Sequence, residues 1–305
     1  MENSLADSTI KQYNITFKLW WEFCQTKDLS PFCDTASHIL SFFQELLNNT
    51  NSTYGSFNYH RSAISLISSI DIGKNPLIKR FLKAVFRKRP PKPKYDSIWN
   101  PQEVLNFLDS PNDGNLKALS SKLITLLALA TGQRIQTLSL IKCSNIVKTN
   151  IGIKILIPEL IKTSGPKSFQ PCLTLPYLQQ KPYLCVASLI VKYLEETKDI
   201  RQKECEHFWL TYKKPHGPAT KQTLSRWIKD TLKSAGINTS IFSTRSTRHA
   251  STSFAYQKGL SYEAIRTSAG WSKESSVVAK FYNRPIGNTE EFLPTVFGDL
   301  TDKEK

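Results

Sequence analysis

A set of side chains that could act together on a phosphodiester occurs, in order, along the last two thirds of the sequence. The set comprises Arg134, Lys162, Arg245, Arg248, Trp271 and Tyr282. A phosphodiester under attack gathers negative charge on its non-bridging oxygens, and planar guanidinium groups match that charge with paired hydrogen bonds. A tyrosine hydroxyl can supply the nucleophile. The set therefore indicates cleavage of a DNA backbone without a metal ion.

The chemistry assigns different tasks to the members of this set. Tyrosine is a poor nucleophile at neutral pH because its pKa lies near 10, so it needs cations or a base beside it. Arg134, Arg245 and Arg248 can provide the positive charge. Arginine stays charged and cannot act as a general acid, so the leaving oxygen needs a proton from a lysine or a histidine. Lys162 is the best-placed candidate for that task.

The overall charge agrees with a nucleic-acid substrate. The chain has 41 Lys and Arg residues against 25 Asp and Glu residues, a net charge of +16 and a pI near 9.5. Such a balance favours a polyanionic partner and says little about fold. With 40% hydrophobic and 11% aromatic residues among 305, the chain can bury one large core or two smaller ones. We expect two domains.

Cysteine and histidine spacing indicates neither a zinc site nor a disulfide framework. The six cysteines contain no CxxC pair, and the five histidines do not lie at zinc-ligand spacing from them. We expect reduced thiols and no cofactor. The N-terminus has no signal-peptide pattern, and no apolar run approaches membrane-spanning length. These features predict a soluble intracellular protein without membrane contacts, and a nuclear one in a eukaryotic cell, where the segment 79–94 could serve as an import signal.

The first section has the apolar spacing of a small helical bundle. Helices are predicted from a cap at Ser8, from Thr35, over Asn58 to Ile70, and from Pro76. On the first helix, spacings of three and four define an apolar face made of Ile10, Tyr13, Phe17, Trp21 and Cys24. Four short helices of this kind make a domain.

An uninterrupted basic segment follows, because no acid occurs between Lys74 and Lys94. One interpretation is a solvated helix face followed by a tail. The one-sided charge runs into a proline-rich stretch, however, and this favours a stiff basic linker that tracks a phosphate backbone. The predicted DNA contacts here are Lys79, Arg80, Lys83, Arg87, Lys88, Arg89, Lys92 and Lys94.

A second domain is predicted to begin near Asn100, an N-cap candidate that precedes Pro101. A largely apolar helix then runs to Thr131 and delivers Arg134. Two strand-like stretches follow, at 151–158 and 169–175, and a Gly-Pro turn places Lys162 and Lys167 near the tip of a hairpin or three-stranded sheet. Further helices are predicted over 181–196, 220–234, 246–258 and 261–269, with another containing Tyr282.

The helix predicted from Thr220 has two chemically different faces. The residues expected to face inward are Leu224, Trp227, Ile228, Thr231 and Leu232, and the opposite face carries cations. Core packing alone would explain the apolar face. Basic helices in basic proteins also often contact phosphates, and the candidate DNA contacts are Lys221, Arg226 and Lys229.

The order of these motifs resembles the catalytic signature of the tyrosine recombinase, or phage integrase, superfamily. The stretches that carry the resemblance are Thr131-Gly-Gln-Arg134, the run 243–253 around Arg248, Ala269-Gly-Trp271 and Phe281-Tyr-Asn-Arg284. Their wording is most similar to recombinases of eukaryotic mobile elements of the DIRS, Ngaro and Crypton kinds. The resemblance implies a mainly α fold with a small antiparallel sheet, in which a four-helix, SAM-like core-binding domain precedes an α+β catalytic domain.

The resemblance implies a partition of the chain and a partner. Residues 1–89 would form the core-binding domain, 90–99 the basic linker and 100–287 the catalytic domain. Residues 288–305 would form a tail that docks on a neighbouring subunit or is disordered. The implied partner is double-stranded DNA, bound by a homotetramer.

The resemblance also implies a role for each candidate side chain. Arg134 and Arg248 would hold the scissile phosphate, and Lys162 would protonate the departing 5′ oxygen, with Lys167 as the competing lysine. Tyr282 would attack the phosphorus and leave a 3′-phosphotyrosyl bond, without ATP or metal. Trp271 would offer its indole to the phosphate, and Arg245 would occupy the second basic position.

Departures from the family pattern keep other functions open. Arg245 stands where histidine or lysine is usual, and Thr137 stands where an acid commonly follows the first arginine. A domesticated DNA-binding protein that no longer cuts is therefore an alternative, as is a type IB topoisomerase. Taken singly, Arg248, Trp271 and Tyr282 each have an ordinary structural interpretation, and His249 could be a proton donor, a cap or a core residue.

Overall fold

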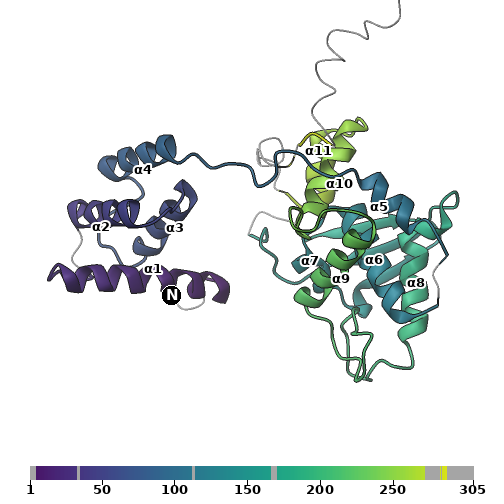
Figure 1. Ribbon diagram of the computed structural model, residues 1–305. Coiled ribbons are helices and arrows are strands. Elements are labelled where there is room, and N and C mark those ends of the chain that lie inside the picture. The colour runs from purple at the N-terminus through teal and green to yellow at the C-terminus, as the bar shows by residue number, and fades with distance from the viewer. Residues whose placement is uncertain are drawn as a thin grey trace, which may run out of the picture. The chain divides into compact units, whose positions relative to one another are not determined.

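The chain divides into two compact units with separate buried cores, Met1–Lys94 and Tyr95–Lys305. The structure is a computed structural model and describes residues 5–32, 35–111, 114–165, 170–271, 282 and 284–286. Figure 1 shows a helical N-terminal unit and a second unit of helices with a small sheet. The predicted fold class, mainly α with a small antiparallel sheet, is confirmed. Among the described residues, no helix combines the length and apolarity needed to cross a membrane.

The N-terminal unit is built from four helices around aromatic side chains. Their bounds are α1 Asp7–Thr26, α2 Ala36–Asn49, α3 Tyr54–Ile64 and α4 Pro76–Lys88. Two predicted helix starts are confirmed: Thr35 caps α2 by accepting from the His38 amide, and Asn75 caps α4 ahead of Pro76. The third helix ends earlier than predicted, because Ile67 packs against the core from a turn.

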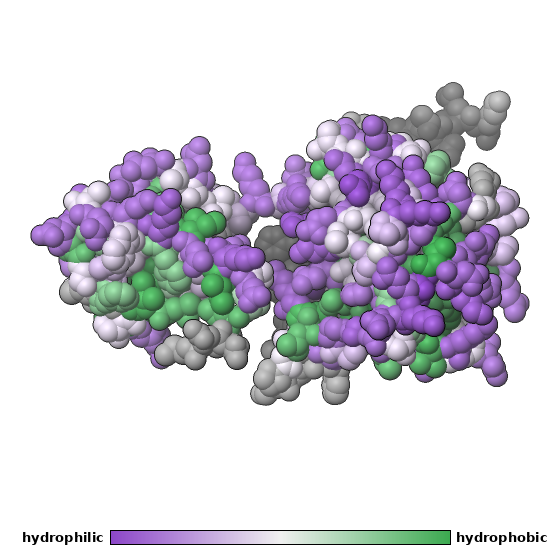
Figure 2. All heavy atoms as spheres, turned by 90° about the horizontal axis from the view of Figure 1, so that it is seen from below, coloured by the Kyte–Doolittle hydropathy of each residue, from purple (hydrophilic) through white to green (hydrophobic). Residues whose placement is uncertain are grey.

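The start and the buried face of α1 differ from the prediction. The helix begins at Asp7 with Ala6 as N-cap, so the predicted cap at Ser8 is wrong. Trp20 is buried and Trp21 is 53% exposed, because the Trp20 indole turns inward and donates to the Pro31 carbonyl at 2.9 Å. Figure 2 shows apolar side chains among the polar ones on this unit, and apolar residues exposed on α1 include Ile10 and Ile15.

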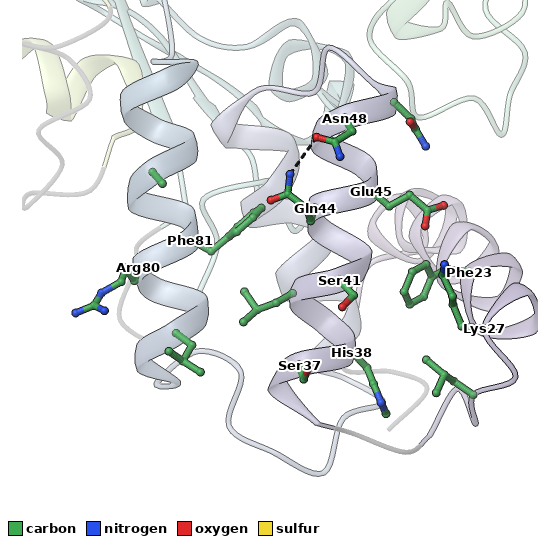
Figure 3. Close-up of a pocket in the computed structure, with 15 residues that line it drawn as sticks. Phe23, Lys27, Ser37, His38, Ser41, Gln44, Glu45, Asn48, Arg80 and Phe81 are labelled. Carbon is green, nitrogen blue, oxygen red and sulfur yellow. Dashed lines mark hydrogen bonds between the residues drawn. The ribbon is translucent and has the colours of Figure 1, made fainter.

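A groove of about 980 Å³ lies between α1, α2 and α4 of the N-terminal unit. Figure 3 shows its mixed lining, in which Gln44 and Asn48 of α2 are joined by a hydrogen bond and face Phe81 of α4. Arg80, a predicted DNA contact, is also part of the lining. The groove contains none of the predicted catalytic side chains, all of which belong to the second unit.

In the second unit, helix α6 packs against α8, α9 and α10. The helices are α5 Pro101–Leu108, α6 Leu116–Thr131, α7 Ile135–Ser139, α8 Val186–Thr197, α9 Lys221–Ser234, α10 Ser246–Gln257 and α11 Tyr262–Ala269. As predicted, Asn100 caps α5 ahead of Pro101, and α6 is buried on most sides. Helix α6 ends at Thr131, three residues before Arg134, the first catalytic candidate.

The sheet is antiparallel and has three strands in the order β1, β2, β3. The strands are β1 Ile146–Thr149, β2 Gly152–Leu156 and β3 Cys172–Pro176. Of the two predicted forms, hairpin or three-stranded sheet, the structure contains the second, with shorter strands than predicted. Ile155 of β2 pairs with Leu173 of β3, and both are buried on the face that meets the core.

The second unit begins inside the segment 90–99 that the sequence predicts as a linker. Tyr95 and Trp99 are buried, and their hydroxyl and indole groups form hydrogen bonds of 2.9 and 2.8 Å with the hydroxyls of Ser243 and Ser246. The Ile98 amide donates to the Pro285 carbonyl at 2.9 Å. Residues 95–99 are thus part of the second unit and contact the residues around the start of α10 and the chain beyond Tyr282.

Candidate active site

Arg134 is presented by a tight turn at the end of α6. Gly132 ends this helix in the left-handed region, with φ of 58°, and a Cβ at this position would lie 3.2 Å from the Ala269 Cβ. Glycine suits both the dihedral angle and the close approach of α11. Arg134 follows as the half-buried N-cap of α7. The turn that presents Arg134 is thereby held against the end of α11, where the Gln133 side chain also donates to the Ser268 carbonyl at 2.9 Å.

Arg248 lies on the first turns of α10 and is only 4% exposed. One of its terminal nitrogens, Nη1, donates to the carbonyls of Gly132 and Ala269 at 2.5 and 2.6 Å. These carbonyls lie at the C-terminal ends of α6 and α11, where helix dipoles place partial negative charge. Two helix ends therefore fix the orientation of this guanidinium.

The other two nitrogens of the Arg248 guanidinium, Nε and Nη2, are buried and form no hydrogen bond of normal geometry with the described residues, although the Tyr282 hydroxyl lies close enough to interact favourably with the charge. The Trp271 ring lies over the guanidinium at 3.4 Å. Burial, together with repulsion from Arg134, lowers the pKa of Arg248 to about 9, although the Tyr282 hydroxyl partly opposes the shift. A shift of this size corresponds to a penalty on the order of 5 kcal/mol for the charged form. An anion bound to the two free nitrogens would relieve it.

In the part of the chain that the structure describes, the two arginines lack a neutralising carboxylate. None of the ion pairs in the described part of the chain involves Arg134 or Arg248. Thr137, which stands where the family pattern has an acid, is buried on α7. An uncompensated pair of guanidinium groups is a site for an anion with several oxygens, such as a phosphate.

Tyr282 lies next to Arg248 in the same chain. Its ring is 5.6 Å from the Arg248 guanidinium and meets the Trp271 ring edge to face at 4.8 Å and 71°. Its other neighbour is His249, whose ring stacks at 4.0 Å and 13°. The Ser253 hydroxyl donates to the Tyr282 carbonyl at 2.6 Å. The predicted nucleophile and a predicted phosphate ligand are thus brought together.

Two other candidates lie on the surface. Lys162 is exposed in a turn beyond β2, which is closed by hydrogen bonds of 2.9 Å between Ile161 and Ser164. Arg245 is exposed at the N-cap of α10. Within the described residues, no contact joins either side chain to Arg248 or Tyr282. The competing lysine, Lys167, and most of the helix predicted around Tyr282 lie outside the described residues, as does the tail 288–305.

The predicted DNA contacts are exposed, with one exception. On α4 and the segment after it, the exposed cations are Lys79, Arg80, Lys83, Arg87, Lys88, Lys92 and Lys94. The two predicted faces of α9 are confirmed: Leu224, Trp227, Ile228, Thr231 and Leu232 are buried, whereas Lys221, Arg226 and Lys229 are exposed. Both surfaces leave their cations available to a polyanion.

Arg89 is the exception, because its guanidinium is engaged within the N-terminal unit. Nη1 donates to the carbonyls of Thr50 and Ser52 at 2.8 and 3.0 Å, and Nη2 donates to that of Leu47 at 2.9 Å. These carbonyls belong to the C-terminal end of α2 and the residues after it. The side chain therefore closes α2 onto α4, and we leave it out of the DNA surface proposed below.

The sequence left His249 open as a proton donor, a cap or a core residue, and it gave no role to two other residues near Tyr282. His249 and Ser253 lie within the recognised run 243–253, and their spacing of one helical turn could have indicated that both face the same neighbour. Tyr95, whose ring meets His249 edge to face at 5.2 Å, had no such signal. Its contact spans more than half of the chain and depends on tertiary packing.

The fold is similar to those of several solved recombinases. The XerH site-specific recombinase in a post-cleavage complex with difH substrate has a TM-score of 0.59 at 13% identity, over 86% of this chain and 72% of its own. The Tn1549 transposon integrase in complex with transposon right end DNA has a TM-score of 0.59 at 14% identity, over 88% of this chain and 87% of its own. A lambda integrase dimer bound to a COC′ core site has a TM-score of 0.55 at 16% identity, over 94% of this chain and 92% of its own. At these identities, the likeness concerns the fold.

The family is given by the sequence itself. Residues 99–286 match the phage integrase family, and this stretch covers more than half of the chain and contains all six catalytic candidates. No protein with a curated description matches at a significant level. The chain belongs to the phage integrase family.

Proposed function

We propose that this protein cuts and rejoins DNA as a tyrosine recombinase, through a 3′-phosphotyrosyl intermediate. The observation that carries the proposal is the pairing of Arg248 with Tyr282. Two nitrogens of a buried guanidinium have no hydrogen-bond partner among the residues that the structure describes, and a tyrosine ring lies 5.6 Å away in the same chain. A buried donor without an acceptor raises the free energy of the folded protein unless a ligand accepts its hydrogen bond. The scissile phosphate is the ligand that fits the pairing of Arg248 with Tyr282.

The reaction divides among the candidates as follows. The Tyr282 oxygen attacks the phosphorus, and the bond from phosphorus to the 5′ oxygen breaks. Arg134 and Arg248 bind the non-bridging oxygens, and Trp271 helps to enclose the phosphate. Lys162 gives a proton to the 5′ oxygen, which requires its turn to approach the site when DNA binds. Attack by another 5′-hydroxyl reverses the step, so neither ATP nor a metal ion is consumed.

Two basic surfaces would hold the duplex. The exposed cations of α4 and the following segment would track the backbone, and those of α9 would make further phosphate contacts. Arg245 would add charge at the edge of the active site. Such contacts position the enzyme, whereas base readout would come from other side chains.

The biological setting that we propose is strand exchange for a mobile element of the DIRS, Ngaro or Crypton kind, in the nucleus. The enzyme would act as a tetramer on two DNA sites, with the segment 288–305 docking on a neighbouring subunit. The solved relatives support assembly on DNA as a general expectation, since lambda integrase has been solved as a tetramer bound to a Holliday junction.

The test is covalent capture on nicked suicide DNA substrates that include the element's own termini. Wild-type protein is expected to form a denaturant-resistant adduct, and Tyr282→Phe is expected to form none while binding DNA equally well. An adduct that persists in Tyr282→Phe would refute the assignment. The alternative is a domesticated DNA-binding protein, which the exposed Arg245 and the missing acid at Thr137 favour. Tight binding by wild-type protein without an adduct would support it.

A further inference from the structure

His249 lies between two aromatic rings, and one of them is the proposed nucleophile. Its imidazole stacks on Tyr282, with ring centroids 4.0 Å apart and planes 13° apart. The Tyr95 ring contacts the same imidazole edge to face, with ring centroids 5.2 Å apart and an interplanar angle of 86°. His249 is half-buried. The nucleophile's ring is therefore supported by a side chain that the proposed reaction does not use.

The support behind His249 is itself fixed. The Tyr95 hydroxyl forms a hydrogen bond of 2.9 Å with the Ser243 hydroxyl and accepts a longer one, 3.3 Å, from the Ser243 amide. Tyr95 is 4% exposed and belongs to the buried core of the second unit. A rigid ring thus lies behind His249 and limits how far the imidazole can move.

The stacking geometry defines what His249 can do. A hydrogen bond from an imidazole nitrogen leaves in the plane of the ring, whereas Tyr282 lies against the face of the imidazole. In this arrangement, His249 cannot exchange a proton with the Tyr282 hydroxyl through an in-plane hydrogen bond. Its contact with the nucleophile is a ring contact, which constrains the position and tilt of the phenol.

We propose that His249 is a positioning residue that holds the Tyr282 ring at the angle required for attack on the phosphate. The proposal rests on the proposed function. Helix α10 then controls the nucleophile through three neighbouring side chains: Arg248 binds the phosphate, His249 supports the ring, and Ser253 holds the Tyr282 carbonyl at 2.6 Å. A misplacement of about 1 Å at a reacting group can slow a reaction by about 100-fold, so loss of the ring contact should reduce the rate.

The test compares His249→Ala, which removes the ring, with His249→Phe, which keeps a ring without imidazole chemistry. Full-length proteins are assayed for the single-turnover rate of adduct formation on nicked suicide DNA, for DNA affinity and for melting temperature. His249→Ala is expected to lower the rate by about 100-fold at unchanged affinity. His249→Phe is expected to recover most of the rate. His207→Phe is the matched control, because the His207 side chain is exposed, and it is expected to behave as wild type.

Two outcomes would overturn the proposal: a wild-type rate in His249→Ala, or a His249→Phe variant that folds but is as slow as His249→Ala. A readout that does not need activity is the fluorine NMR resonance of 3-fluorotyrosine at position 282. Ring stacking predicts that His249→Ala moves this resonance and His207→Phe does not. If wild-type protein forms no adduct, the proposed function fails, and the resonance alone decides the placement. An unmoved resonance in His249→Ala refutes the contact.

Discussion

Two guanidinium groups close the ends of helices in this protein, Arg89 in the N-terminal unit and Arg248 in the second unit. Arg89 donates from both terminal nitrogens to three carbonyls at the end of α2. Arg248 donates from one terminal nitrogen to two carbonyls, at the ends of α6 and α11, and its other two nitrogens have no partner among the described residues. The same side chain is thus satisfied by the fold in one place and left partly unsatisfied in the other.

The difference separates a structural arginine from a binding one. A satisfied guanidinium stabilises the chain and has little capacity for a ligand. Arg248 is more buried than Arg89 and has Arg134 nearby, so its environment disfavours the charged form. Proteins retain such unfavourable groups where a ligand completes their hydrogen bonds. The contrast between Arg89 and Arg248 therefore supports the proposed phosphate site on grounds other than the family resemblance.

The largest expected effect is that of Arg248→Met. Removing the guanidinium that is proposed to bind the phosphate should lower the rate of adduct formation by about 1000-fold, which is the effect of losing a donor to a reacting oxyanion. The substitution removes a buried charge in an unfavourable environment, which offsets the loss of the two hydrogen bonds to the Gly132 and Ala269 carbonyls, so the melting temperature should change little. The measurements are single-turnover adduct formation and thermal unfolding. A large fall in melting temperature would contradict the account, because it would make Arg248 mainly structural.

Arg89→Met should lower the stability of the protein and leave the rate of adduct formation unchanged. Loss of its charge-assisted hydrogen bonds to the end of α2 is expected to destabilise the N-terminal unit by about 2 kcal/mol. Faster amide hydrogen exchange in the last turn of α2 would report this change in the full-length protein. Once DNA is saturating, the adduct rate should match wild type. Lys88→Met, a change at an exposed neighbour, is the control, and equal destabilisation by both would contradict the structural role.

The smallest expected effect concerns the exposed cations of α4. Replacing a lysine that contacts a phosphate reduces the slope of log affinity against log salt by about 0.9. Lys83→Gln is expected to do so, because the side chain is exposed. Lys142→Gln is the control, since Lys142 is held by Glu159 and Glu206, both at 3.3 Å. Filter binding over a salt series would measure the slopes, and equal slopes for wild type and Lys83→Gln would remove α4 from the DNA surface.

Local signals were enough to predict most elements and the order of the site. Caps at Thr35, Asn75 and Asn100 mark helix starts because their side chains bond to nearby amides, and this chemistry is visible in sequence. The two faces of α9 follow from helical periodicity in the same way. Family membership rests on ordered motifs, so the candidates could be found before their geometry was known.

Tertiary contacts account for what the sequence did not predict. Trp20 and Trp21 are equally apolar neighbours, and tertiary contacts with Pro31 and Phe42 select the first for the core. Arg89 bonds to carbonyls, which have no signature in sequence. Tyr95 reaches His249 because the segment 95–99 packs on α10, although it reads as part of a linker. Such choices depend on segments far apart in the chain.

The most direct test of the account is to identify the residue that carries DNA after cleavage. Wild-type protein would be trapped on a nicked suicide substrate, digested with a protease and a nuclease, and analysed by mass spectrometry. The account predicts a nucleotide attached through a 3′-phosphate to Tyr282, and no such peptide from Arg248→Met in the same reaction time. A nucleotide on any other residue, or none on wild-type protein that binds the DNA tightly, would contradict it.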